Sequence, residues 1–512
     1  MKKIALFLIS FCFIFISSAQ NKVTLLKDEL GKTREAASVA NGLLQGHDDQ
    51  YYVYNEDFYD KAGKGMVADA IFCIDKNGAT MNEIKVTHPE DYEFVKFYED
   101  QDDIFAIYKT YKWKTKTFGL YMNTIGKDQS APAWDPEELV KVQTERNEDL
   151  YAFSSVSPDN TKLVVSLILA GRKGNMKGSS VMTFGADGAK LWDNTLSLEF
   201  NNPNFKILNM IISNDAEVFV TLASYGDVSR KTREDETFHL YKITSDNVVF
   251  VDEKIPFGFI SNAESYINKK GEVVVAGYYC TDLTEYEGGT YAVIFDNKTE
   301  QLKDISHQDF APEYAIQEKA ALGVPKNTKF TVNPDHIYEF NDGSYALIGE
   351  QQQVIIRTTT SPNGMTTSTY TYYAKNILVS FLDEDGKIDD FKMIKKLQIV
   401  GPGRPLTFKR RQAAGYSFTS FMLNNNIHLF FQDHIDNYSG RADVPCRASS
   451  SSNHCTVHTT IQEDKSLTSK VVIDPNKSDI RMIAPLFLED NGMLLINANK
   501  KVMQLSKLSL SL

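Results

Sequence analysis

Short runs of apolar and β-branched residues, separated by turns rich in Asp, Asn, Gly and Lys, recur along almost the whole chain. This pattern is typical of β-hairpins, because these turn residues tolerate the backbone conformations that a tight hairpin needs. Two kinds of turn alternate. Inner turns join two apolar runs, as in residues 153–166, and outer turns lead from an apolar run to a more polar one, as in residues 181–192.

The two kinds of turn alternate along the chain with a long period. Inner turns are predicted at residues 46–49, 99–103, 157–160, 213–216, 268–271, 341–344, 423–426 and 489–492, and outer turns at 75–78, 123–127, 186–189, 244–247, 296–299, 383–386 and 474–478. Each inner–outer pair brackets four strands, which is one blade of a β-propeller. The sequence therefore predicts an all-β protein with a single large propeller of about eight four-stranded blades. Seven blades are the alternative, because the first inner turn is the least distinctive, and a pair of β-sandwiches would also give regular hairpins.

The last repeat, residues 485–508, supplies an inner turn and about three strands. Residues 22–26, Lys-Val-Thr-Leu-Leu, could supply the fourth strand from the other end of the chain. Such a strand would close the ring and remove the exposed strand edges that otherwise promote aggregation.

Three segments interrupt the period. Residues 308–322 have a helical composition, residues 357–373 are Thr-rich and predict an extended hairpin, and residues 433–462 predict a long loop. Insertions in repeat folds tend to gather on one face, which is often the face that binds a partner. We therefore expect the binding surface where these three segments lie.

The N-terminus has the pattern of a secretory signal. Lys2 and Lys3 precede an apolar run over residues 4–16, and small residues lead to an expected cleavage after Ala19. The predicted domains are a signal peptide, 1–19, and a propeller, 20–512, although a retained anchor is the alternative. We expect an exported protein, periplasmic or at the cell surface, and no other stretch is long and apolar enough for a membrane-spanning helix.

The charge narrows the choice of partner. Loss of the two signal lysines would take the formal net charge from −12 to −14. An acidic chain without a basic stripe argues against nucleic acid as the partner.

Two sets of short strings resemble known proteins. Residues 157–165, Ser-Pro-Asp-Asn-Thr-Lys-Leu-Val-Val, resemble the short repeat of TolB-type and WD40-like propellers. Residues 349–351 (Gly-Glu-Gln), 377–386, 395–398 (Lys-Lys-Leu-Gln) and 430–433 (Phe-Phe-Gln-Asp) resemble a pattern in secreted proteins of Bacteroidota that have no established activity. The resemblance covers about a third of the chain and implies an exported propeller, without implying a function.

One predicted loop holds Cys446 and Cys455, nine residues apart, with His454 and His458 beside them. A disulfide is the simpler interpretation in an oxidising compartment. A zinc site is the alternative, because two cysteines and two histidines could supply four ligands.

Two charged clusters are further candidates. Asp383, Asp385 and Asp389 alternate around a Gly turn and could contact a hard cation such as calcium, or simply form a soluble turn. The basic cluster could bind a phosphate, a sulfate or an acidic glycan, or form a solvated surface; it comprises Arg404, Lys409, Arg410 and Arg411.

Local signatures of catalysis are absent from the sequence, which has no Gly-x-Ser-x-Gly elbow, no His-Glu-x-x-His and no phosphate-binding Gly loop. We expect no cofactor. The favoured hypothesis is a non-catalytic envelope binding or scaffold protein that uses a propeller face to bind a protein or glycan. The alternative is a glycan-active hydrolase whose carboxylates come from different blades around a central channel, because such acids leave no local motif.

Overall fold

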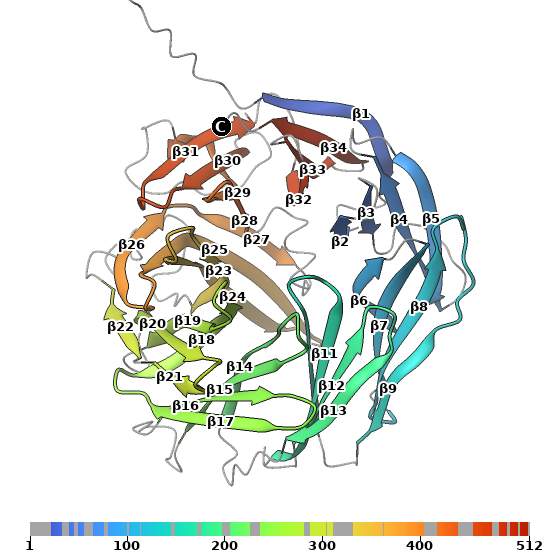
Figure 1. Ribbon diagram of the computed structural model, residues 1–512. Coiled ribbons are helices and arrows are strands. Elements are labelled where there is room, and N and C mark those ends of the chain that lie inside the picture. The colour runs from blue at the N-terminus through green and yellow to red at the C-terminus, as the bar shows by residue number, and fades with distance from the viewer. Residues whose placement is uncertain are drawn as a thin grey trace, which may run out of the picture.

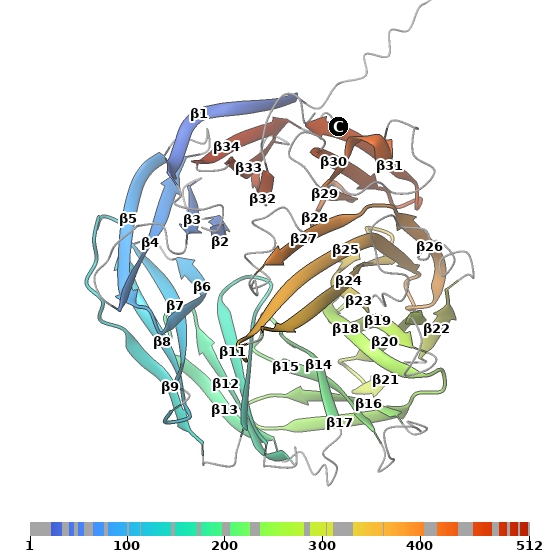
Figure 2. The same cartoon turned by 180° about the vertical axis from the view of Figure 1, so that it is seen from behind.

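The computed structural model arranges eight antiparallel sheets in a ring (Figures 1 and 2). We number the sheets as blades 1 to 8 in chain order. The structure describes residues 22–32, 40–45, 50–55, 65–75, 80–99, 102–112, 114–144, 149–170, 176–196, 205–225, 236–280, 287–303, 305–310, 331–361, 363–403, 417–438, 454–473, 481–488, 492–499 and 502–509.

The first four blades have four strands each. Blade 1 contains β2 (Ala40–Gln45), β3 (Tyr51–Asn55), β4 (Met66–Ile74) and β5 (Thr80–Pro89). Blade 2 contains β6 (Tyr92–Glu99), β7 (Asp103–Lys112), β8 (Thr117–Gly126) and β9 (Glu137–Gln143). Blade 3 contains β10 (Asp149–Val156), β11 (Lys162–Ala170), β12 (Met176–Gly185) and β13 (Lys190–Leu196). Blade 4 contains β14 (Phe205–Ile212), β15 (Val218–Tyr225), β16 (Glu236–Ile243) and β17 (Val248–Lys254).

In blades 5 and 6 the fourth strand is divided in two. Blade 5 contains β18 (Phe259–Ile267), β19 (Val273–Cys280), β20 (Glu287–Asp296), β21 (Gln301–Leu302) and β22 (Ser306–Asp309). Blade 6 contains β23 (Thr331–Glu339), β24 (Tyr345–Thr360), β25 (Thr366–Leu382), β26 (Ile388–Ile394) and β27 (Gln398–Gly403). Blade 7 contains β28 (Phe418–Leu423), β29 (Asn426–His434), the 3-10 helix η2 (Ile435–Tyr438), β30 (His454–Ile461) and β31 (Leu467–Ile473).

Blade 8 joins the two ends of the chain. It contains β32 (Arg481–Leu488), β33 (Gly492–Asn499), β34 (Val502–Ser509) and, as its outermost strand, β1 (Lys22–Lys32). β1 runs antiparallel to β34, with Lys22 opposite Ser509 and Leu25 opposite Ser506. The predicted eight-bladed ring closed by an N-terminal strand is thus confirmed, and the seven-blade and sandwich alternatives are wrong.

Side chains at the start of the predicted turns explain why the chain reverses there. In the inner turn of blade 4, the Ser213 hydroxyl accepts hydrogen bonds from the backbone N–H groups of Asp215 (3.2 Å) and Glu217 (3.0 Å). In blade 5, the Asn268 Oδ1 atom accepts from the N–H groups of Lys270 (3.0 Å) and Glu272 (2.8 Å). These bonds satisfy turn donors that no strand can satisfy.

Two predicted outer turns differ from the structure. In the one expected at 123–127, residues 123–126 belong to β8, and the chain turns at 126–129, where the Gln129 N–H donates to the Gly126 carbonyl at 3.0 Å. Residues 474–478 do not close a hairpin, because they lie between β31 of blade 7 and β32 of blade 8. The outer turn of blade 7 is residues 462–466, where the Gln462 N–H donates to the Ser466 carbonyl at 3.1 Å. The links between blades use the same Asp, Asn and Lys residues as the hairpin turns, so residue type alone does not separate them.

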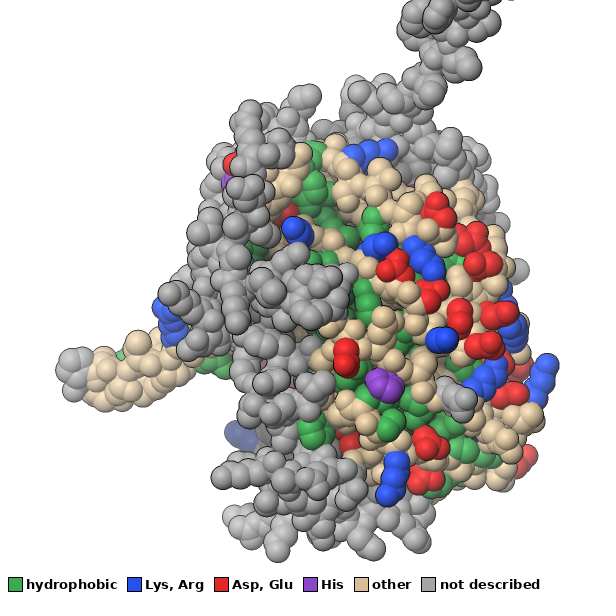
Figure 3. Space-filling view, turned by 90° about the vertical axis from the view of Figure 1, so that its left-hand side faces the viewer, with side chains coloured by type: hydrophobic (Ala, Val, Ile, Leu, Met, Phe, Trp, Pro, Cys, Tyr) green, Lys and Arg blue, Asp and Glu red, His purple; other side chains and the backbone are tan. Residues whose placement is uncertain are grey.

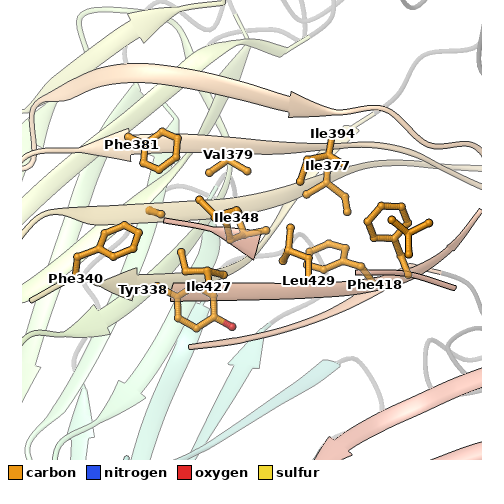
Figure 4. Packing of buried hydrophobic residues seen from close by; sticks show 14 of the residues in the cluster. Tyr338, Phe340, Ile348, Ile377, Val379, Phe381, Ile394, Phe418, Ile427 and Leu429 are labelled. Atoms are coloured by element: carbon orange, nitrogen blue, oxygen red, sulfur yellow. The ribbon is translucent and has the colours of Figure 1, made fainter. Parts of the chain in front are cut away.

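The hydrophobic core is divided into clusters, and six of those in the described residues lie between two successive blades, while a small one lies within blade 6. Between blades 6 and 7, for example, Val379 and Phe381 of β25 pack with Ile427 and Leu429 of β29 (Figure 4). Equivalent clusters occupy the interfaces from blade 1 to blade 6. Stability therefore depends on each blade having both neighbours, which gives ring closure its importance.

Two of the three predicted insertions can be compared with the structure. Residues 357–373 form the end of the long β24–β25 hairpin, as expected. The prediction of one loop over 433–462 is wrong in part, because η2 and the regular strand β30 occupy 435–438 and 454–461. The predicted helix at 308–322 lies largely outside the described residues, which place 306–309 in a strand. In the described part of the chain, no helix has the length and apolar character needed to cross a membrane.

Candidate functional site

The strand order assigns every connection to one of two faces of the ring. Successive strands of a blade are antiparallel, so the inner and outer turns lie on one face, which we call the turn face. The connections from second to third strand, and from each blade to the next, lie on the other face, which we call the connection face. The strand ends flanking all three predicted insertions lie on the connection face, in the neighbouring blades 5, 6 and 7.

The β24–β25 hairpin extends beyond the rest of blade 6. β23 pairs with β24 only as far as Gln352, and β24 continues to Thr360. On the other side, β27 pairs with β25 as far as Tyr370, which lies opposite Ile356. The part beyond both neighbouring strands is therefore residues 357–369, about 13 Å long at ~3.3 Å per residue. We call residues 353–373 the arm. Seen from behind, the hairpin runs in front of the ring towards its centre (Figure 2).

The surface of the arm is mostly uncharged, with Arg357 as its only charged residue. Val354 is 42% exposed, Ile356 56% and Met365 65%. Val354 and Ile356 are two residues apart on one strand, so their side chains lie on the same face of the hairpin. Elsewhere, acidic and basic side chains are interspersed on the described surface in Figure 3, which makes the nearly uncharged arm distinct.

A buried ion pair lies where the arm joins its blade. Lys396 contacts Glu350, and their side chains are 0% and 1% exposed. Lys396 also donates to Gln398 Oε1 at 2.8 Å, and the Ser417 hydroxyl donates to Glu350 Oε2 at 2.7 Å. Gln398 Nε2 in turn donates to the Gln432 carbonyl of blade 7 at 2.6 Å. We call this group the arm-base network.

The arm-base network brings together residues from three of the four strings that carry the resemblance to secreted proteins of Bacteroidota. Glu350 belongs to the Gly-Glu-Gln string, Lys396 and Gln398 to Lys-Lys-Leu-Gln, and Gln432 to Phe-Phe-Gln-Asp. The network spans the interface of blades 6 and 7 and also holds Ser417 at the start of blade 7, because Gln398 Oε1 accepts a hydrogen bond from the Ser417 N–H at 2.7 Å.

A second polar group extends from this network along the innermost strands. Asn333 Nδ2 donates to Gln352 Oε1 at 3.3 Å, and Asn262 Nδ2 donates to Asn333 Oδ1 at 2.9 Å. Lys206 Nζ donates to Asn262 Oδ1 at 3.1 Å. The chain of contacts thus links blades 4, 5 and 6 around the ring axis.

Two carboxylates occupy neighbouring innermost strands. Glu264 of β18 accepts a hydrogen bond from Asn209 Nδ2 at 2.7 Å, and Asp335 of β23 accepts from the Ser420 hydroxyl at 3.1 Å. Burial raises the pKa of Glu264 to about 7, and the nearby charge of Asp335 adds to this shift. Asp335 is exposed to solvent, and partial desolvation by the neighbouring strands raises its pKa to about 6. One of these groups can therefore hold a proton near neutral pH.

Bulges in the innermost strands help to place these side chains. Six of the eight innermost strands in the described pairings shift register by one residue against the second strand of their blade: β2, β6, β14, β18, β23 and β32. Asp335 is itself the extra residue in β23, between Pro334 and His336. A bulge bends the strand and redirects its side chain.

The predicted cation residues lie on the turn face, away from the arm. The Asp383 carboxylate accepts from the N–H groups of Asp385 (3.0 Å) and Lys387 (2.8 Å), and Asp389 pairs with Lys465 at 2.6 Å. These contacts are those of a hairpin turn. Among the described residues, no group of three or more His, Cys, Asp or Glu side chains is placed to hold a metal ion.

The cysteine and basic candidates are only partly described. Cys455 is buried at the start of β30, 3.5 Å from the Asp433 carbonyl, and Cys446 lies outside the described residues. The basic cluster of Arg404, Lys409, Arg410 and Arg411 also lies outside them. Arg404 follows Gly403, which pairs with Tyr370 of the arm.

Within the described residues, His454 and His458 do not belong to any group of side chains that could bind zinc. They lie on β30, and His458 Nε2 is 2.9 Å from His428 Nδ1 of the adjacent β29. Burial lowers the pKa of His458 to about 3 and that of His428 to about 4, so both rings are neutral at physiological pH.

Sequence reasoning missed Glu264, Asp335, Glu350 and Lys396. The first two have no local motif, because their neighbours come from other blades. Glu350 did carry a signal, since it is a charged residue next to a strongly apolar run, a position that favours burial only for a paired charge. Lys396 lies between Lys395 and Leu397 and carries no such signal.

Comparison with known proteins supports the β-propeller fold and gives no information on function. No protein-family profile and no curated protein sequence matches the chain. The β-propeller domain of the trilobed protease from Pyrococcus furiosus is 8% identical, with a TM-score of 0.32, over 82% of this chain and 94% of that one. Prolyl oligopeptidase B from Galerina marginata is 9% identical, with a TM-score of 0.41, over 90% of this chain and 55% of that one. An α-L-arabinanase from Penicillium chrysogenum is 10% identical, with a TM-score of 0.29, over 82% and 95%. These are similarities of β-propeller architecture, and no activity follows from them.

Proposed function

We propose that this chain is an exported, non-catalytic binding protein that holds a partner protein of the cell envelope on its connection face. The arm is the main contact. The observation that carries this proposal is the set of exposed apolar side chains on the arm, Val354, Ile356 and Met365, on a hairpin that extends beyond its blade.

Physical chemistry favours a partner for such a hairpin. Exposed apolar side chains on a projecting hairpin lose water contact when another surface covers them, at about 25 cal/mol per Å² of apolar area. The arm-base network holds the hairpin rigidly to blades 6 and 7, so little conformational entropy is lost on binding. The N-terminal signal pattern supports export, to the periplasm or the cell surface.

Affinity capture from envelope fractions tests this function. The wild-type chain is compared with a variant carrying Val354→Thr, Ile356→Thr and Met365→Thr, and with a matched control carrying Met81→Thr, Leu191→Thr and Phe250→Thr. The control residues are 58%, 48% and 46% exposed on the outermost strands. We expect the arm variant alone to lose the captured partner. Equal capture by all three proteins would contradict the proposal.

The second candidate function is a glycan hydrolase that uses Glu264 and Asp335. Their neighbouring positions and raised pKa values suit a general acid paired with a second carboxylate. Hydrolysis of polysaccharides, measured by release of reducing ends, would be abolished by Glu264→Gln. The absence of hydrolysis in the wild-type chain would dismiss this candidate and leave the binding function in place.

A further inference from the structure

A pocket lies between blades 1 and 2, away from the arm. It has a volume of about 490 Å³, within the ~300–1,000 Å³ range of pockets for small ligands. Its lining residues come from β4, β5, β6, β7, β8 and the link between the two blades. They lie at the connection-face ends of these strands, so the pocket opens on the same side as the arm but several blades away.

The pocket is lined by both aromatic and polar side chains. Tyr92, Phe94, Tyr111 and Phe118 supply rings, and Val67 adds an aliphatic surface. Tyr92 is held in place by edge contacts with Trp134 and Tyr121, with ring centroids 5.0 and 5.1 Å apart. The polar part of the lining comprises four carboxylates together with Lys109 and Thr110; the carboxylates belong to Asp69, Glu90, Asp91 and Glu93.

The deepest polar group is fixed by buried contacts. Asp69 and His88 form a pair with an O–N distance of 2.7 Å, and their side chains are 2% and 3% exposed. Tyr54 donates its hydroxyl hydrogen to Asp69, and the other His88 nitrogen is 2.9 Å from the Pro89 carbonyl. A preorganised acceptor at the base of a pocket is what orients a small polar ligand.

The charge balance selects the class of ligand. Glu93 pairs with Lys109 at 3.3 Å, Asp91 with Lys112 at 3.8 Å, and Asp69 with His88, so most of the carboxylate charge is already compensated. Four carboxylates disfavour an anion, and few of them are left to attract an organic cation. Paired carboxylates still accept hydrogen bonds from hydroxyl groups, and aromatic faces attract the weakly positive C–H groups of a sugar ring.

We propose that this pocket binds one or two rings of a neutral saccharide. The sugar hydroxyls donate to the carboxylates, Lys109 donates to a ring or hydroxyl oxygen, and one face of the ring stacks on Tyr111 or Tyr92. The site is independent of the partner-protein function proposed for the arm, because the two lie in different blades.

The test uses the full mature chain on an array of immobilised neutral mono- and oligosaccharides, with choline and spermidine as cationic probes in solution. Affinity for the best saccharide is then measured by calorimetry for the wild type, Tyr111→Ala and Glu90→Gln. Tyr151→Ala is the matched control, because Tyr151 is 51% exposed on β10 in blade 3. We expect about tenfold weaker binding for Tyr111→Ala, about threefold for Glu90→Gln and no change for the control.

Three results would overturn the saccharide site: no array signal for the wild type, binding of choline or spermidine alone, or unchanged affinity in both pocket variants. If Tyr111→Ala lowers the melting temperature, Glu90→Gln carries the test, since Glu90 is exposed at the rim. The arm variant should keep full saccharide affinity, which separates failure of this site from failure of the proposed function.

Discussion

Lys396 and Glu350 form an ion pair in the interior of the ring, with both side chains at most 1% exposed. Each charge is stabilised mainly by the other, because water does not reach either of them. The pair lies where the arm meets blade 6, and its hydrogen bonds to Gln398 and Ser417 extend to blade 7. It therefore couples the position of the arm to the packing of two blades.

Removing one partner of this pair should destabilise the fold. We expect Lys396→Met to lower the free energy of unfolding by about 3–5 kcal/mol, because it leaves Glu350 as an uncompensated buried charge. Urea denaturation followed by tryptophan fluorescence measures this change. The double variant Glu350→Leu with Lys396→Met should lose less than Lys396→Met alone. A single-variant loss below about 1 kcal/mol would show that water reaches the pair.

Glu264 should make stability depend on pH. Its pKa rises from 4.5 in the unfolded chain to about 7 in the folded protein. The stability that protonated Glu264 contributes to the folded protein is therefore fully present below pH 4.5 and is lost as the pH rises to 7. We expect Glu264→Gln to flatten the pH profile of the melting temperature between pH 4.5 and 7. At pH 8 the variant should be more stable by about 1–2 kcal/mol, a value reduced for partial solvent screening. Parallel profiles for wild type and variant would refute this assignment.

The strand β1 should be essential for a soluble monomer. Truncation of residues 1–32 leaves the outer edge of β34 without its partner, and an open strand edge promotes association. We expect a lower melting temperature and soluble aggregates in size-exclusion chromatography with light scattering. A chain beginning at Lys22 serves as the control and should remain monomeric. Equal behaviour of the two truncated chains would mean that β1 does not close the ring.

The disulfide between Cys446 and Cys455 stays a prediction from the sequence. A bridge between two cysteines nine residues apart should stabilise the chain by about 2–3 kcal/mol through loop closure. Peptide mapping without reduction should recover the two cysteines in one linked peptide, and Cys446→Ser should lower the melting temperature. Alkylation of both thiols without prior reduction would rule the bridge out.

The ring of blades could be predicted from the sequence because each hairpin turn is encoded by residues that lie close together in the chain. Ser213 and Asn268 mark their inner turns by hydrogen bonds within five residues, and side-chain hydrogen bonds mark the inner turns of blades 3 and 6 as well. The error at 474–478 has the same origin, since a link between blades can contain turn residues without forming a hairpin. Strand β1 was found because the last repeat lacked a strand.

The candidate site was less predictable because its contacts are distant in sequence. Glu264 and Asp335 are 71 residues apart, and the register shift that places Asp335 leaves no mark in residue type. Glu350 and Lys396 belonged to strings already noted for their resemblance, yet nothing local shows that the strings meet. The apolar exposure of the arm also depends on where β23 ends, which a sequence pattern does not specify.

Site-specific photo-crosslinking tests the central claim most directly. A photoreactive amino acid is placed at Ile356 on the arm, or at Phe250 on the outermost strand of blade 4, in otherwise wild-type chains expressed in the native envelope. We predict one dominant crosslinked protein at position 356 and none at position 250. Crosslinks of equal yield at both positions, or none at position 356, would contradict binding through the arm.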